Sequence, residues 1–261
     1  MSALLTGSAD IILAGPETVV YTDQQGTKDA PVVFGQLTHC DGSFIVSKEN
    51  ETNFTLDNLV GETIIGGRQG GLPAMTLQYI IEHNGYSIGT KNTDINLRTD
   101  VAFNLTASVW EAESSTKYCT LFEPTATNIE KECKGYVVAS LGELSGSIPY
   151  TCFATKQSYL KKHGQQAEKF LKAIKKAYTF ISTHTSNEVA ESLKPSFAGN
   201  TTEEIASAVE QYLTIQAWGA DLTLSQESFN NLMNVMLKAK IITKTSNWSD
   251  IVDNTIAQKL N

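Results

Sequence analysis

The pattern of apolar and polar residues predicts mainly short strands over the first part of this chain, up to about residue 104. Short β-branched runs bounded by glycine, proline or aspartate predict strands. A helix is predicted after Pro73, because Met75, Tyr79 and Ile80 follow a helical spacing and Asn84-Gly85 is a typical stop. The predicted strands in this part are residues 10–13, 32–38, 43–48 and 63–65.

The centre of the chain continues the same alternation of strands and helices. A short strand followed by a helix is predicted over 118–132, and further strands over 135–143 and 148–155. Strands separated by helices are typical of an α/β fold with a parallel or mixed sheet.

From Lys161 onward only helical periodicity remains. Ala167, Leu171 and Tyr178 belong to one apolar stripe with lysines on the opposite side. Thr201 or Thr202 and, further on, Ser225 are suited to begin two later helices. We expect this helical tail to cover another part of the protein rather than to form a separate binding arm.

Composition narrows the possible functions. The 261 residues, 41% of them hydrophobic, suffice for one large domain or two smaller ones. A net charge of −8 argues against a general nucleic-acid binder, which needs a basic face to neutralise phosphates. No stretch approaches the roughly 20 apolar residues of a membrane span. We expect no nucleic-acid partner and no cofactor.

The four cysteines lack the paired spacing of a zinc site, so no metal is expected. Cys119 and Cys133 fall near the ends of predicted elements, and a disulfide between them is one interpretation. Buried free thiols are the other. The spacing alone leaves both open.

A glycine-rich turn with one arginine follows the strand at 63–65. It runs Arg68-Gln69-Gly70-Gly71-Leu72-Pro73 and leads directly into the predicted helix. Glycines let backbone N–H groups approach an anion, and a helix N-terminus adds partial positive charge beside Arg68. The spacing matches neither nucleotide-binding glycine motif. The turn is therefore either an anion site for a carboxylate, sulfonate or phosphate, or a strand–helix turn that needs small residues for packing.

Four further segments interrupt the strand pattern with glycine or proline. They lie at the ends of predicted strands, where α/β folds place ligand loops. Each is equally compatible with a simple turn. The breaks are Gly15-Pro16-Glu17, Asp41-Gly42-Ser43, Phe122-Glu123-Pro124 and Ile148-Pro149-Tyr150.

Arrangements for nucleophilic catalysis are weak in this sequence. There is no G-x-S-x-G motif, and the four histidines stand in unrelated contexts. His39 and Cys40 are adjacent on a predicted strand and would face opposite ways, so they do not suggest a catalytic pair. We expect a protein that is not an enzyme, with no catalytic residue.

Several of these segments together resemble a known family. The order of "ALLTGSADIILAGPE", "LVGETIIGGRQGGLPAMTLQYIIEHNG" and "VVASLGELSGSIPYTCFAT" is similar to that of the substrate-binding proteins of ABC importers. The branch resembled is the nitrate/sulfonate/taurine and thiamine-precursor type (SsuA/THI5-like, NMT1-like), with the type 2 periplasmic-binding-protein fold. The resemblance covers essentially the whole chain.

The resemblance implies two lobes, each a mixed sheet flanked by helices, with a helical C-terminal part. The lobes would be residues 1–42 plus 149–261 and residues 43–148, joined by hinges at Asp41-Gly42 and Pro149-Tyr150. A monomer outside the cytoplasm, periplasmic or a cell-surface lipoprotein, would close on a small solute and present it to a membrane permease. The inter-lobe cleft would be lined by Gly15, Pro16, Glu17, Asp41, Gly42, Ser43, Arg68, Gly70, Gly71, Phe122, Glu123 and Tyr150.

The chain departs from the family pattern at its beginning. The family starts with an export signal and a strand–helix–strand unit, and here the matching segments begin after that unit, without a signal peptide. The first lobe is therefore expected to be incomplete, and a remnant without activity is one alternative. Another is an enzyme of the same fold acting on a small anionic or pyrimidine-precursor substrate, with Glu17 and Glu123 as an acid/base pair.

Overall fold

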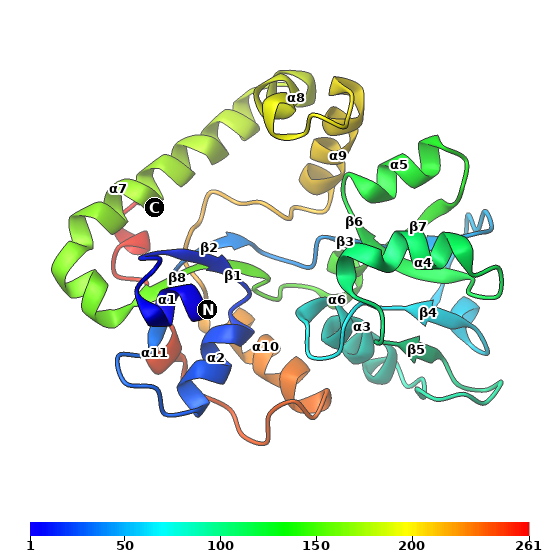
Figure 1. The fold of residues 1–261 in the computed structure, drawn as a ribbon, viewed down its shortest axis with the longest axis horizontal. Helices are drawn as coiled ribbons and strands as arrows, with labels where there is room; N and C mark the ends of the chain where they lie inside the picture. The colour runs from blue at the N-terminus through cyan, green and yellow to red at the C-terminus, as the bar shows by residue number, and fades with distance from the viewer. Residues whose placement is uncertain (261) are drawn as a thin grey trace. The chain divides into compact units, whose positions relative to one another are not determined.

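The computed structural model describes residues 1–260, which fold into two compact units (Figure 1). Unit 1 comprises Met1–Cys40, Ser147–Thr185 and the chain from Gln216 onward, and unit 2 comprises Asp41–Gly146 and Ser186–Ile215. Chain crossings between the units therefore fall at 40/41, 146/147, 185/186 and 215/216. The predicted breaks at 41–42 and 149–150 lie close to the first two crossings, and their role as hinges stays a prediction.

Unit 1 is built on a three-stranded antiparallel sheet with β8 in the middle. Its strands are β1 (Ile12–Ala14), β2 (Pro31–Thr38) and β8 (Thr151–Lys156). Its helices are α1 (Ser2–Thr6), α2 (Glu17–Gln24), α7 (Gln157–Thr183), α10 (Gln226–Lys238) and α11 (Trp248–Ile251). The three strands that the sequence predicts in this unit are confirmed to within a few residues.

The apolar stripe of α7 packs on the sheet of unit 1. Leu171 and Tyr178 join Phe34 of β2 and Phe153 of β8 in one core cluster. The Tyr178 hydroxyl donates a hydrogen bond to the carbonyl of Leu37. The prediction that the helical tail covers another element is therefore confirmed for α7.

Unit 2 contains a mixed five-stranded sheet in the order β5-β4-β6-β3-β7. Strand β4 pairs in parallel with β5 and β6, whereas β3 pairs antiparallel with β6 and β7. The strands are β3 (Ser43–Ser47), β4 (Thr63–Ile65), β5 (Asn96–Arg98), β6 (Tyr118–Phe122) and β7 (Tyr136–Ser140). The helices are α3 (Leu72–His83), α4 (Thr106–Ala112), α5 (Thr125–Lys131), α6 (Leu141–Ser145), α8 (Ser186–Leu193) and α9 (Thr202–Thr214). The predicted α/β architecture with sheets flanked by helices is confirmed. The sheet of unit 2 is mixed as expected, whereas the sheet of unit 1 is antiparallel.

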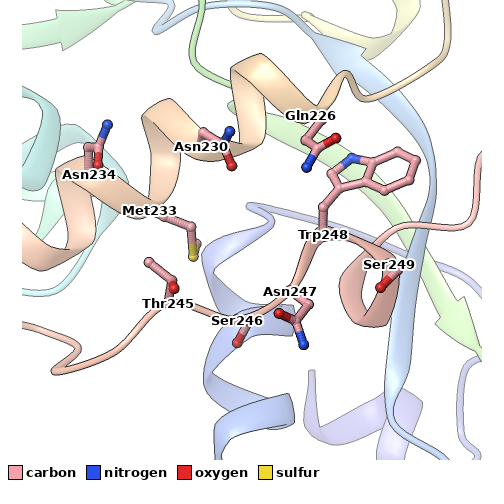
Figure 2. A pocket seen from close by; sticks show the side chains of 9 residues that line it. All are labelled: Gln226, Asn230, Met233, Asn234, Thr245, Ser246, Asn247, Trp248 and Ser249. Carbon is pink, nitrogen blue, oxygen red and sulfur yellow. The ribbon is translucent and has the colours of Figure 1, made fainter.

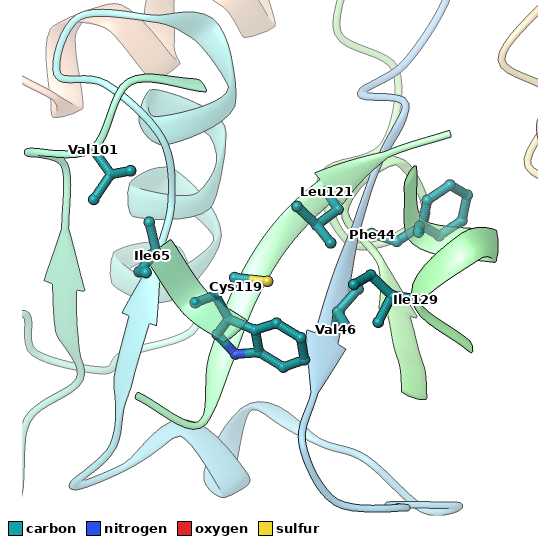
Figure 3. Packing of buried hydrophobic residues seen from close by; sticks show 9 residues of the cluster. Phe44, Val46, Ile65, Val101, Cys119, Leu121 and Ile129 are labelled. Atoms are coloured by element: carbon teal, nitrogen blue, oxygen red, sulfur yellow. The ribbon is translucent and has the colours of Figure 1, made fainter. Parts of the chain in front are cut away.

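The sheet of unit 2 is buried on both faces. Successive strand residues point to opposite faces, so Phe44 and Val46 of β3 enter one core cluster while Ile45 enters the other. The first cluster surrounds Trp110, which is fully buried and donates its indole N–H to the carbonyl of Lys117 at 3.1 Å. Figure 3 shows Val46, Cys119 and Ile129, which belong to the same cluster as Trp110.

The predicted strand at 135–143 is wrong in its second half. Strand β7 ends at Ser140 and α6 begins at Leu141, because the Ser140 hydroxyl accepts a hydrogen bond from the Glu143 N–H at 3.3 Å and so caps the helix. The sequence prediction also left out α2, α4, α8 and β5.

The helical tail is divided between the two units. Helices α8 and α9 belong to unit 2, where Tyr212 and Ile215 pack against the cluster around Trp110. The assignment of α8 and α9 to unit 2 differs from the expected lobes, which placed all of residues 149–261 in one lobe. Which residues move together as a lobe stays a prediction. The predicted N-cap of α9 is confirmed at Thr201, which forms a capping box with Glu204.

All four cysteines are free thiols in the structure. Cys40, Cys119 and Cys152 are buried, as the thiol interpretation expected, whereas Cys133 is exposed. No bridge joins Cys119 to Cys133.

Among residues 1–260, the structure contains no helix whose length and apolar character would let it span a bilayer.

Gly135 should be intolerant of a side chain, because an added Cβ would lie 2.6 Å from Trp110 Cη2 and 2.9 Å from the Ser47 carbonyl oxygen. We expect Gly135→Ala to destabilise the protein by about 1–3 kcal/mol through overpacking. Gly164→Ala in α7 is the matched control, since its Cβ would meet nothing within 4 Å and alanine favours a helix by about 0.5–1 kcal/mol. The midpoint of urea unfolding should fall for the first variant and rise or stay for the second; equal midpoints would contradict this account of the Trp110 packing.

Candidate functional site

The five-stranded sheet brings three of the predicted ligand segments to one end of unit 2. Strands β4 and β6 run in parallel, so the turn after Ile65 and the residues after Leu121 leave the sheet at the same edge. Strand β3 runs the other way, and its first residue, Ser43, pairs with Phe122. We call this edge the unit 2 site; its predicted members are Asp41, Gly42, Ser43, Arg68, Gly70, Gly71, Phe122 and Glu123.

The first segment is held by a buried aspartate. The Asp41 Oδ1 atom accepts hydrogen bonds from the Ser43 N–H at 2.8 Å and from the Ser43 hydroxyl at 2.6 Å. Both residues are completely buried. This is the local turn that an aspartate favours before a strand, and it fixes the chain where it enters β3.

Gly42 allows two aromatic rings to approach the backbone closely. A Cβ at this position would lie 3.1 Å from Tyr212 and 3.4 Å from Phe122. Phe122 also meets the edge of Phe103, with ring centroids 5.0 Å apart. The aromatic wall of the unit 2 site therefore contains two residues that the sequence did not predict as site residues, Phe103 and Tyr212.

The glycine-rich turn is fixed by its own backbone. The Gln69 N–H donates to the carbonyl of Thr99 at 3.0 Å, and the Gly71 N–H donates to the carbonyl of Arg68 at 3.2 Å. Gly70 adopts a positive φ of 74°, a conformation that favours glycine. Gly71 is the N-cap of the twelve-residue helix α3, so the turn places Arg68 beside the positive end of a helix dipole.

The two arginines of the chain differ in their surroundings. Arg98 forms ion pairs with Asp100 at 3.0 Å and Glu113 at 2.5 Å. Arg68 is exposed, and within residues 1–260 its side chain forms no recorded ion pair or hydrogen bond. Arg68 is therefore the arginine whose planar donors are available to a ligand.

Glu123 presents a partly satisfied carboxyl group at the same edge. Its Oε2 atom accepts a hydrogen bond from the Thr127 N–H at 3.0 Å, whereas Oε1 is buried and has no partner among residues 1–260. Burial raises the pKa of Glu123 above its usual value, and the hydrogen bond from Thr127 opposes this. The Glu123 N–H donates to the Tyr212 hydroxyl at 3.2 Å, which ties α9 to the site.

The remaining predicted residues gather at one end of the sheet of unit 1. Ala14 at the end of β1 pairs with Cys152 of β8, and the Tyr150 N–H donates to the carbonyl of Thr38 at 3.3 Å. Gly15, Pro16 and Glu17 are therefore near Tyr150, as their positions at strand ends predict.

Gly15-Pro16-Glu17 is the beginning of a helix rather than an isolated loop. Pro16 is the N-cap of α2 and Glu17 is its first residue. The Glu17 carboxylate folds over Gly15, where a Cβ would lie 2.0 Å from Oε2, so a larger residue at this position would displace the Glu17 side chain. Glu17 is 7% exposed.

His39, at the end of β2, is a polar residue of the same region that sequence reasoning considered only beside Cys40. Its Nε2 atom is enclosed and has no hydrogen-bond partner among residues 1–260. Burial lowers the pKa of His39, whereas Asp221 acts in the opposite direction. Because burial has the larger effect, the neutral ring is favoured near pH 7. A Cβ at Gly219 would lie 2.9 Å from this nitrogen.

Comparisons with known proteins agree with this fold. The family model described as "NMT1/THI5 like" matches residues 1–187. "Putative binding protein YtlA" of Bacillus subtilis (strain 168) is 36% identical over 260 residues, covering 100% of this chain and 77% of that protein.

Solved structures show the same architecture at low identity. The periplasmic aliphatic sulphonate binding protein SsuA from Escherichia coli superposes with a TM-score of 0.74 at 16% identity, over 97% of this chain and 78% of that one. The ligand binding component of an ABC-type import system from Staphylococcus aureus gives 0.76 at 14%, over 100% and 84%. The periplasmic nitrate-binding protein NrtA from Synechocystis PCC 6803 gives 0.70 at 12%, over 99% and 76%. The predicted periplasmic-binding-protein fold is thereby confirmed.

The raised pKa of Glu123 predicts a pH-dependent contribution to stability. A carboxyl group whose pKa is higher in the folded state favours folding below its unfolded pKa of about 4.3, and this contribution is lost as the pH rises through the folded pKa. Glu123→Gln removes the buried charge. The melting temperature of the variant minus that of the wild type should therefore increase as the pH rises from about 4 to about 8. Glu191→Gln, an exposed position in α8, is the control and should show no such trend. A constant difference between Glu123→Gln and wild type across this range would overturn the account of a desolvated carboxyl.

Proposed function

The chain belongs to the NMT1/THI5-like family, and on that premise we propose that it is the solute-binding component of an ABC importer. It captures a small solute without chemical change and hands it to a membrane permease. The proposal is supported by the 36% identity to a protein named as a binding protein and by structural neighbours named for sulfonate and nitrate binding.

The observation that carries the solute class is the position of Arg68. An available guanidinium stands in the turn that leads into the N-terminus of α3, so a charge, a bidentate donor pair and a helix dipole coincide. This arrangement favours a sulfonate, nitrate, carboxylate or phosphate group. Gly70 and Gly71 keep the backbone free of side chains beside that group.

The rest of the unit 2 site favours a second, different group on the solute. The buried Oε1 of Glu123 lacks a partner among residues 1–260 and would accept a hydrogen bond from an N–H donor. Phe122 and Tyr212 supply aromatic surface next to it. A solute with an anionic group and an amino group, such as taurine, or an amino-substituted pyrimidine precursor matches these groups better than nitrate does.

The predicted contribution of Gly15, Pro16, Glu17 and Tyr150 to binding the same solute stays a prediction. The location outside the cytoplasm, the monomeric state and the contact with a permease also stay predictions. The raised pKa of Glu123 follows from its burial. The proposal includes no catalytic step.

Arg68→Ala is the sharpest test of the solute class. A bound solute raises the melting temperature by mass action, and a screen of taurine, alkanesulfonates, nitrate, aromatic carboxylates and aminopyrimidines identifies the class. We expect the variant to lose the shift given by anionic members, with about a tenfold or greater loss of affinity for a charge-assisted hydrogen-bond pair.

Lys91→Ala is the matched control, because Lys91 is an exposed cation of unit 2 outside the site. It should bind as the wild type does. A full shift in Arg68→Ala would disprove the role of the turn, and no shift with any compound in the wild type would count against the proposed function itself.

A further inference from the structure

A hollow in unit 1 is lined mainly by uncharged polar groups. It has a volume of about 680 Å³ and lies between α10 and the segment that leads into α11. We call it the amide groove. Its lining residues are Gln226, Asn230, Met233, Asn234, Thr245, Ser246, Asn247, Trp248 and Ser249.

The groove is distinct from the predicted solute residues of unit 1. One of its lining residues, Ser246, donates a hydrogen bond from its hydroxyl to Asp23, near the carboxyl end of α2, at 2.8 Å. Gly15 and Glu17 stand instead at the amino end of the same helix.

One wall is a row of amide side chains on α10. Gln226, Asn230 and Asn234 follow at steps of four residues, so they lie on one face of the helix. Figure 2 shows them in a line along α10, with Gln226 beside the Trp248 indole. Within residues 1–260 none of the three forms a recorded side-chain hydrogen bond, so each keeps both donors and an acceptor for a ligand.

The opposite wall is held in place by its own hydrogen bonds. The Trp248 indole N–H donates to the carbonyl of Leu224 at 3.2 Å, which fixes the orientation of the ring. The Asn247 side-chain amide donates to Asp250 at 2.9 Å. Met233, only 2% exposed, supplies an apolar side chain to the lining. The wall that contains Asn247 and Trp248 is therefore ordered before any ligand arrives, which lowers the entropic cost of binding on that side.

The lining chemistry selects a class of ligand. None of the nine lining residues carries a formal charge, although the chain as a whole carries −8. Amide and hydroxyl groups offer donors and acceptors in equal measure, and the indole offers a flat apolar surface. A sugar ring has the same two features, with hydroxyl groups around its rim and C–H groups on its faces. The volume falls within the range of about 300–1,000 Å³ that is usual for ligand sites.

We propose that the amide groove binds a neutral carbohydrate, one or more hexopyranose units stacked on Trp248 with their hydroxyl groups bonded to Gln226, Asn230 and Asn234. This site lies within unit 1 and does not depend on the solute that the protein carries. The same chemistry is offered by a free oligosaccharide and by a chain of an insoluble polysaccharide.

Calorimetric titration of the intact protein with maltotriose, cellotriose and triacetylchitotriose tests the free sugars, and co-sedimentation with cellulose and chitin tests the polymers. We expect binding of at least one probe with a dissociation constant of about 1 mM or tighter. Because the ligand is neutral, its affinity should be the same at low and high salt.

Asn230→Ala should weaken this binding by about tenfold, since it removes hydrogen bonds to the ligand. Trp248→Ala should abolish it, and Glu227→Ala, an exposed change on α10 outside the groove, should leave it intact. If Trp248→Ala does not fold, the side-chain amide resonances of Gln226, Asn230 and Asn234 supply the evidence, because they should shift on adding the sugar to the wild type. Absence of binding at about 10 mM of every probe, or binding that Asn230→Ala leaves unchanged and that shifts none of these resonances, would overturn the proposal.

Discussion

Strand β6 is paired on both sides, and the positions of the candidate ligand residues in unit 2 depend on those pairings. Its parallel partner β4 brings the Arg68 turn to the edge where β6 ends, and its antiparallel partner β3 brings Asp41 to the same edge. The register matters as much as the direction. A slip of one residue would move every side chain of β3 to the other face of the sheet.

Polarity alone cannot set that register, because all five residues of β3 are buried. Two other features do. Phe44 and Val46 must meet the large indole of Trp110, whereas Ile45 belongs to the cluster that contains Tyr118. The strand also begins and ends with buried serines that are satisfied locally, Ser43 by Asp41 and Ser47 by the N–H of Glu49 at 3.1 Å. The hydrogen bonds between Asp41 and Ser43 therefore fix the start of β3 at the unit 2 site. They also explain why the Asp41 carboxylate can be buried there.

The sequence predicted those parts of the site whose signal is local. The glycine-rich turn and its helix, and the Asp-Gly-Ser turn before β3, are determined by residues within a few positions of each other, and both were found where expected. Tyr212 and Phe103 were missed, because an apolar stripe on a helix indicates that it packs but not against what. The same limit explains why the sequence grouped α9 with the rest of the helical tail, whereas the structure assigns it to unit 2. The error at 135–143 was avoidable, since Ser140 and Glu143 have the spacing of a helix cap.

Binding of an anion, as proposed for this protein, has to occur against the negative net charge of the chain. Charges further apart than about 8 Å are largely screened in physiological salt, so the groups nearest to an anion matter more than the net charge of −8. The groups of the unit 2 site that bear on an anion are Arg68, the amino end of α3, the buried carboxylate of Asp41 and the carboxyl of Glu123. Because burial favours the neutral form of that carboxyl, it opposes an anion less than an exposed glutamate would. An anionic solute would therefore gain little from long-range attraction, and its affinity would depend on the geometry of the turn and on how slowly the solute leaves.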